Sequence, residues 1–300
     1  MKIQLDWLKE YVDTDLSAEE VGHLLTMAGL EIEAQEILEL SNGIRSEVLE
    51  LNVTPNRGYC LNYLGVAREV AALLGKPFKF PDHLSELEKA WGPDLLEGKL
   101  LVDNREPELC PRYSGMIIEN VQPGPSPSWL VDRLTAIGIR SVNNIVDITN
   151  YVMLELGQPL HAFDLSKITT KKIDVKSSKN KEKFKSLDGE NRELNSNMLS
   201  ITDGAQSIGL AGIIGGFNSE IDSKTKNIFL ESACFEMSNI RQSSKELGLN
   251  TDASHRFERG VPIELSIIAL NRAIALINNI NKKEIIINGN WDLYSKSINI

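Results

Sequence analysis

The sequence predicts an α/β (α+β) protein, with a small N-terminal α/β domain followed by a larger mixed α+β domain. Residues 1–82 alternate helical and strand-like patterns, whereas residues 105–280 mix several strands with short helices. Between them, residues 83–104 are weakly patterned and broken by glycine and proline, which is typical of a linker. The 300 residues are 42% hydrophobic and 25% charged, so they can fill about two globular cores.

The N-terminal domain is predicted to hold helices over 18–27 and 62–74. Ser17 and Glu20 form a capping box that starts the first, and Gly75 ends the second. Leu5, Leu8 and Val12 also have helical spacing. The strands expected here cover 31–38 and 47–53, with a turn at 41–43.

In the larger domain, apolar runs and the residues that bound them predict further strands and helices. The expected strands cover 113–120, 173–177 and 228–230, and the expected helices cover 128–137 and 263–278. Residues 142–152 resemble a buried strand whose aliphatic run is interrupted by polar residues. Residues 281–300 are expected to begin a further C-terminal domain, because strand candidates at 284–287 and 291–294 would leave an unpaired edge.

Composition and motifs exclude many functions. There is no GxxxxGK[ST] loop, GxGxxG, HExxH or GxSxG motif, which argues against ATP, NAD and zinc chemistry by this chain alone. The three scattered cysteines fit a reducing compartment, and no run approaches a membrane span, so a cytoplasmic location without membrane contact is expected. A net charge of −10 means that any nucleic-acid contact must be local or carried by a partner.

Polar side chains inside apolar runs are the candidates for chemistry. His161 follows a proline that fixes the backbone, and Glu231 ends an apolar run, where a carboxylate must be paired or lie in a pocket. Each also has a structural explanation, as a satisfied core histidine and as a strand-end residue facing solvent. Charged residues at 252–259 form either a basic patch that faces a nucleic acid or, as we favour, an internal salt-bridge network.

Eight segments resemble the bacterial-type phenylalanyl-tRNA synthetase (phenylalanine–tRNA ligase) β subunit. They are LDWLKEYV (5–12), LLTMAGLE (24–31), VTPNR (53–57), RSVNNIVDITNYVMLELGQPLHAFD (140–164), SLDG (186–189), GLAGIIGG (209–216), LESACF (230–235) and ASHRFERG (253–260). The resemblance covers nearly the whole chain. It departs from the family in lacking the oligonucleotide-binding insertion between residues 38 and 47 and the domains that follow residue 300.

The resemblance implies that residues 105–280 are a tRNA-editing domain, which hydrolyses tyrosine wrongly attached to phenylalanine tRNA. The implied catalytic residues are Thr149, Asn150, His161 and Glu231. The implied substrate-binding residues are Arg140, Ala211, Gly212, Gly215 and Gly216. In this interpretation Glu231 accepts the hydroxyl of tyrosine, and phenylalanine would leave the buried carboxylate unpaired. The glycines of 209–216 would let a ligand approach the backbone.

The implied partners are phenylalanine tRNA and the synthetase α subunit, although the domains that would contact the α subunit are missing. No metal or other cofactor is expected for this chain, since ATP and Mg²⁺ belong to the full synthetase. Two alternatives stay open. The chain is either a structural, tRNA-positioning portion that is inactive without the α subunit and the missing domains, or a binder of free aromatic amino acids.

Overall fold

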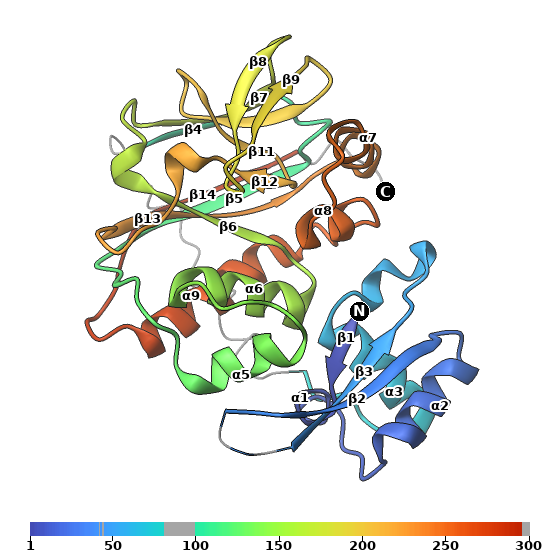
Figure 1. Ribbon diagram of the computed structural model, residues 1–300. Coiled ribbons are helices and arrows are strands. Elements are labelled where there is room, and N and C mark those ends of the chain that lie inside the picture. The colour runs from blue at the N-terminus through green and yellow to red at the C-terminus, as the bar shows by residue number, and fades with distance from the viewer. Residues whose placement is uncertain (42, 44, 81–99, 296–300) are drawn as a thin grey trace.

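The computed structural model describes residues 1–41, 43, 45–80 and 100–295. The N-terminal part and a larger body of stacked layers lie side by side (Figure 1). In the larger body a five-stranded sheet lies on a four-stranded sheet, and helices cover the other face of the latter. This arrangement confirms the predicted mixed α/β fold class. No helix among the described residues is both long and apolar enough to cross a bilayer.

The N-terminal part is a three-stranded antiparallel sheet of order β1-β3-β2, packed against helices. The predicted capping box is present, because Ser17 accepts the Glu20 amide and Glu20 accepts the Ser17 amide. Val12 does not continue the first helix, but pairs with Phe78 in an isolated bridge. The elements are β1 (Lys2–Gln4), α1 (Leu5–Leu8), α2 (Ala18–Met27), β2 (Ile32–Glu39), β3 (Arg45–Leu51), η1 (Pro55–Cys60) and α3 (Tyr63–Leu74).

Two sheets and a hairpin make up the β structure of the larger body. The antiparallel four-stranded sheet has the order β14-β5-β13-β6, from β5 (Arg112–Glu119), β6 (Leu160–Asp164), β13 (Asn227–Cys234) and β14 (Ile286–Tyr294). The five-stranded sheet has the order β12-β11-β10-β7-β4, from β4 (Leu101–Asn104), β7 (Lys172–Ser177), β10 (Leu199–Thr202), β11 (Ser207–Leu210) and β12 (Ile214–Gly215). The hairpin joins β8 (Glu182–Lys185) and β9 (Asn191–Leu194).

Helices α6 and α9 lie against the four-stranded sheet, and α5 packs on α6 (Figure 1). The helical elements here are α5 (Ser128–Ala136), α6 (Asn144–Leu156), η3 (Leu165–Lys167), η4 (Phe217–Ser219), α7 (Met237–Leu247), α8 (Asp252–Phe257) and α9 (Leu265–Ile280). Helices α2, α3, α5 and α9 and strands β2, β3, β5 and β7 confirm elements predicted from the sequence, with ends shifted by one or two residues.

Alternation along β13 separates two hydrophobic cores. Ile228 and Leu230 belong to the core that lies between the sheet and its helices, whereas Phe229 and Ala233 belong to the core between the two sheets. Successive side chains of a strand point to opposite faces, so Glu231 shares the face of Phe229 and Ala233. The core on the helix side also includes side chains of the N-terminal part, such as Trp7.

Three expectations from the sequence are wrong in detail. Residues 144–152 belong to helix α6 and residues 142–143 precede it, so this segment is not a strand. Residues 101–104, expected in the linker, form β4, while residues 83–99 lie outside the described residues. Residues 286–294 form one strand that pairs with β5, with a register shift between Ile287 and Asn290, rather than two strands of a further domain. Residues 296–300 also lie outside the described residues.

Candidate functional site

A cavity of ≈ 440 Å³ runs along the free edge of β6, between helix α6 on one side and strands β11 and β12 on the other. Its walls are mainly apolar, and a few polar side chains converge on it, which is typical of small-molecule sites. Of the nine predicted site residues, seven line this cavity: Thr149, Asn150, His161, Ala211, Gly212, Gly215 and Glu231.

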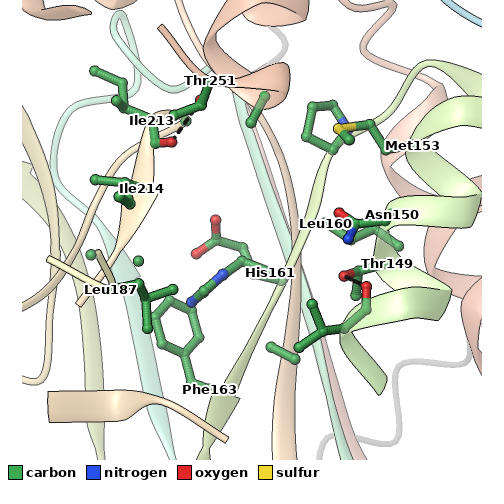
Figure 2. A pocket seen from close by; sticks show the side chains of 18 of the residues that line it. Thr149, Asn150, Met153, Leu160, His161, Phe163, Leu187, Ile213, Ile214 and Thr251 are labelled. Carbon is green, nitrogen blue, oxygen red and sulfur yellow. Dashed lines mark hydrogen bonds between the residues drawn. The ribbon is translucent and has the colours of Figure 1, made fainter. Parts of the chain in front are cut away.

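His161 lies on β6, and its ring points into the cavity above Phe163 (Figure 2). The two rings meet edge to face with centroids 4.5 Å apart. Its Nε2 atom is buried and has no hydrogen-bond partner among the described residues. Burial lowers the pKa of His161 to about 4, so the imidazole is neutral at pH 7 and keeps a lone pair that can accept a proton or a water hydrogen.

Glu231 lies in the middle of β13, directly opposite His161 on β6 and Gly115 on β5. The side chain is 7% exposed, and its Oε2 accepts a hydrogen bond of 2.7 Å from the hydroxyl of Tyr113. Burial raises the pKa of Glu231 to about 7, and the bond from Tyr113 opposes that rise. The expectation of a strand-end carboxylate facing solvent is therefore wrong, because the strand continues to Cys234.

Thr149 and Asn150 lie on α6, across the cavity from Leu187 and Ile214 (Figure 2). The hydroxyl of Thr149 donates to the carbonyl of Val146 at 2.7 Å, so its oxygen lone pairs are left to accept. The side-chain amide of Asn150 has no hydrogen bond to other described residues. These two side chains can therefore bind polar groups of a ligand.

Helix α6 explains the polar residues that interrupt the apolar run. Asn143 caps the helix by accepting the amides of Ile145 and Val146. Asp147 is fully buried. Its carboxylate accepts hydrogen bonds from the hydroxyls of Ser126 and Ser141 and from the backbone amide of Val142. The carboxylate thereby holds the loop before α6, which forms part of the cavity wall at Val142 and Asn143.

Packing leaves no room for a side chain at the glycines near β12. A Cβ at Gly215 would lie 2.4 Å from Cε1 of His161. Gly212 has a φ of +65°, and a Cβ there would lie 2.8 Å from both Ile240 and Phe235. Gly216 does not line the cavity, because it faces Ile208 and Asn218. Arg140 does not line it either and is exposed.

Several residues of the cavity were not predicted as site residues. Leu187 lies beside His161, and Thr251 closes the far end, where its hydroxyl donates to the carbonyl of Ile213 at 2.9 Å (Figure 2). Leu187 and Thr251 lie within or beside segments that carry the family resemblance, so the resemblance could have identified them as site residues. Tyr113 does not line the cavity but bonds to Glu231, and it lies outside every such segment, so the sequence gave no signal for it.

The charged residues at 252–259 form an internal network, as predicted. Arg256 is 4% exposed and bonds to Asp252 at 2.9 Å and to the carbonyl of Leu61 at 3.1 Å. Arg259 pairs with Glu258 at 2.6 Å and bonds to Nδ1 of His255 at 2.8 Å. The alternative of a basic surface patch is therefore wrong. Among the described residues, no three histidine, cysteine or acidic side chains are grouped to hold a metal ion.

Comparison with known proteins places this architecture in a family. The profile of the B3/4 domain matches residues 109–282, which include every strand of the two sheets except β4 and β14, and all the residues that line the cavity. The chain belongs to the B3/4 domain family.

Curated relatives carry the same name in several bacteria. This B3/4 chain is 46% identical over 262 residues to the phenylalanine–tRNA ligase beta subunit of Geobacter sulfurreducens, covering 87% of this chain and 32% of the relative. It is 46% identical over 270 residues to that of Carboxydothermus hydrogenoformans, covering 87% and 33%. It is 41% identical over 281 residues to that of Rhodopirellula baltica, covering 93% and 40%. The resemblance to β subunits is confirmed, and the chain spans about a third of the length of these relatives.

One solved structure is a more distant match. It is an N-terminal fragment of the phenylalanyl-tRNA synthetase beta subunit from Pyrococcus horikoshii, with a TM-score of 0.40 and 17% identity. The match covers 83% of this chain and 74% of that chain.

Proposed function

We propose that this chain acts in quality control of tRNA aminoacylation, as the editing portion of a phenylalanine–tRNA ligase β subunit. The reaction is hydrolysis of the ester that links tyrosine to phenylalanine tRNA. The observation that carries this proposal is the pair of Glu231 and His161, which lie opposite each other on neighbouring strands and both line one mainly apolar cavity. The names of the relatives supply phenylalanine and its tRNA, and tyrosine as the wrongly attached amino acid is what the family resemblance implies.

Glu231 is suited to select the substrate. A phenol that enters the apolar cavity can donate a hydrogen bond to the carboxylate, whereas phenylalanine would leave a buried carboxylate without its second donor. Sites built for a substrate hydroxyl reject the analogue that lacks it by roughly 10⁴-fold or more. The apolar walls favour the aromatic ring of either amino acid, so the selection depends on the hydroxyl.

His161 is suited to position the attacking water. The water oxygen bonds to the ester carbonyl carbon, and the bond from that carbon to the ribose oxygen breaks. The water gives up a proton, and the ribose oxygen takes one as it becomes a hydroxyl. A neutral imidazole whose Nε2 has no partner among the described residues can accept the water hydrogen and later return it. Such a hydrolysis needs no metal or other cofactor, because an aminoacyl ester is already labile and positioning supplies much of the rate.

The charge of the chain suggests how the tRNA is held. With a net charge of −10, the chain offers little attraction for phosphates, so we expect the α subunit or other parts of the ligase to hold the tRNA body. The chain would then bind mainly the aminoacyl end. The alternative of a purely structural portion predicts that no ester is hydrolysed even when an α subunit is present.

The test is release of tyrosine from Tyr-tRNA(Phe) by the purified chain, with and without an α subunit from a relative. The proposal expects release above the spontaneous rate, and a loss of about 10²-fold or more in His161→Ala. A matched control is His23→Ala, which changes an exposed histidine on α2 and should leave the rate unchanged. Release at the spontaneous rate under both conditions would refute the proposal.

A further inference from the structure

Tyr113 is a buried tyrosine whose hydroxyl has one partner among the described residues, the carboxylate of Glu231. The side chain is fully buried on β5, and its hydroxyl donates to Oε2 of Glu231 at 2.7 Å. In the register of β5 and β13, Tyr113 lies opposite Ala233 and Glu231 lies opposite Gly115. The two side chains are therefore diagonal neighbours on one face of the sheet.

The packing around Tyr113 fixes where its hydroxyl points. Gly115 has no side chain, and the ring of Phe229 fills the space that one would occupy, with Cζ 2.1 Å from the position of a Cβ. The rings of Phe229 and Tyr113 are stacked, with centroids 6.5 Å apart and planes 15° from parallel. Because both rings are held in the core between the sheets, the hydroxyl has little freedom to leave Glu231.

We propose that Tyr113 is the positioning residue for Glu231. Its hydroxyl holds one carboxylate oxygen and favours the ionised form, in which the side chain is a pure acceptor toward a ligand hydroxyl. This inference rests on the proposed function, since it concerns selection of tyrosine in the same cavity. An ionised carboxylate has about four acceptor positions and no proton to donate, so it can take the hydroxyls of Tyr113 and of the substrate together.

Protonation of Glu231 would weaken the selection. A neutral carboxylic acid costs less to leave unpaired in an apolar cavity than a carboxylate does, so phenylalanine would be excluded less strongly. The groups that face Glu231 are Tyr113 from β5 and His161 from β6, with Cys110 just before β5. Glu220 and Asp252 line other walls of the cavity. Among the causes of the raised pKa of Glu231, burial comes first, and the Tyr113 bond is the one that opposes it.

The experiment is a titration of Glu231 in the full chain labelled with ¹³C at the glutamate carboxyl, with the signal assigned by its absence in Glu231→Gln. In the wild type the expected midpoint is about 7. Tyr113→Phe keeps the ring and removes the hydroxyl, so the midpoint should rise by about one to two units, which is what a hydrogen bond to a charged group converts to. Tyr63→Phe is the matched control, because it removes another fully buried hydroxyl, which bonds to the amide of Gln4.

The second readout is the ratio of tyrosine to phenylalanine release as a function of pH. The ratio should rise with pH through the midpoint of Glu231, and in Tyr113→Phe the curve should move to higher pH by the same one to two units. A midpoint that does not move in Tyr113→Phe would overturn the inference, even if the wild type hydrolyses Tyr-tRNA(Phe). If the wild type releases no tyrosine, the proposed function fails, while the titration still decides whether Tyr113 controls Glu231.

A measurement on the wild-type fold covers the case in which Tyr113→Phe does not fold. With ¹³C at the tyrosine Cζ, the signal of Tyr113 should shift as Glu231 titrates and should stay constant with pH in Glu231→Gln. A Tyr113 signal that does not change as Glu231 titrates would contradict the proposed positioning of Glu231 by Tyr113.

Discussion

The ring of His161 occupies the space in which a side chain of Gly215 would lie. A Cβ at Gly215 would be 2.4 Å from Cε1 and 2.6 Å from Nε2 of His161, closer than any non-bonded carbon contact allows. The backbone of β12 therefore lies directly against the imidazole. The ring is held between Gly215 and Phe163. The glycine is needed for the position of the candidate catalytic side chain.

Gly215→Ala should displace His161 and lower tyrosine release by about 10²-fold, the cost of moving a reacting group by about 1 Å. Gly124→Ala is the control, since a Cβ there meets its nearest atom at 3.9 Å and the residue lies outside the cavity. Rates with both variants, alongside their melting temperatures, check the prediction. Full activity in Gly215→Ala would show that the ring position does not matter.

A buried ion pair joins α6 to α9 and to the N-terminal part. Glu155, which is fully buried, accepts two bonds from Arg272, at 2.7 and 2.9 Å, and one of 2.7 Å from the hydroxyl of Tyr11. Arg272→Met leaves the carboxylate buried without its cation and should lower the free energy of unfolding by about 3–5 kcal/mol, measured by urea denaturation.

An exposed ion pair provides the control for that prediction. Lys183 and Glu193 pair at 2.6 Å with side chains that are 76% and 51% exposed. Lys183→Met should change the free energy of unfolding by less than about 1 kcal/mol. Equal effects of the Arg272 and Lys183 substitutions would contradict the assigned role of Glu155.

Stability should depend on pH through Glu231. Its pKa is about 7 in the folded chain and near the model-peptide value of 4.5 when unfolded, so the unfolded state loses its proton first. The stabilising contribution is fully present below pH 4.5 and is lost as pH rises through 7, by roughly 3 kcal/mol. Glu231→Gln should remove this loss, so the variant gains stability relative to the wild type between pH 5 and 8.

His161 makes an opposing contribution to the pH dependence of stability. Comparing the wild type with Glu231→Gln removes this contribution. Burial lowers its pKa to about 4, so its contribution is present above 6.5 and is lost as pH falls through 4. Because both proteins retain His161, the difference between wild type and Glu231→Gln isolates the carboxylate. Urea denaturation at pH 5, 6, 7 and 8 measures this difference, and a difference that stays constant with pH would contradict the buried position of Glu231.

The sequence predicted helices and strands well where capping residues or glycine mark their ends and one face is apolar. Ser17 and Glu20 cap α2 as expected, and Gly75 ends α3 in the left-handed conformation at a φ of 62°. Helix α6 was mistaken for a strand because it is buried on nearly all sides, so no polar face reveals its period. Its ends did carry signals, an N-cap at Asn143 and Gly157 at a φ of 89°.

The candidate site residues were predicted from the family resemblance more than from sequence patterns. The structure adds the strand pairing, which neither could supply. Seven of the nine named residues line one cavity, yet their sequence positions range from 149 to 231. The pairing of β6 with β13 places Glu231 opposite His161, and strand pairing is not visible in a single sequence. Tyr113 was missed for the same reason, because only the register of β5 brings its hydroxyl to Glu231.

The ratio of tyrosine to phenylalanine release is the most direct test of substrate selection by Glu231. It is measured on Tyr-tRNA(Phe) and Phe-tRNA(Phe) at pH 8, where Glu231 is ionised, for the wild type and Glu231→Ala in the presence of an α subunit. Selection by the carboxylate of Glu231 predicts a strong preference for tyrosine in the wild type, falling by at least about 10²-fold in the variant. A preference that survives in Glu231→Ala would contradict selection by this carboxylate.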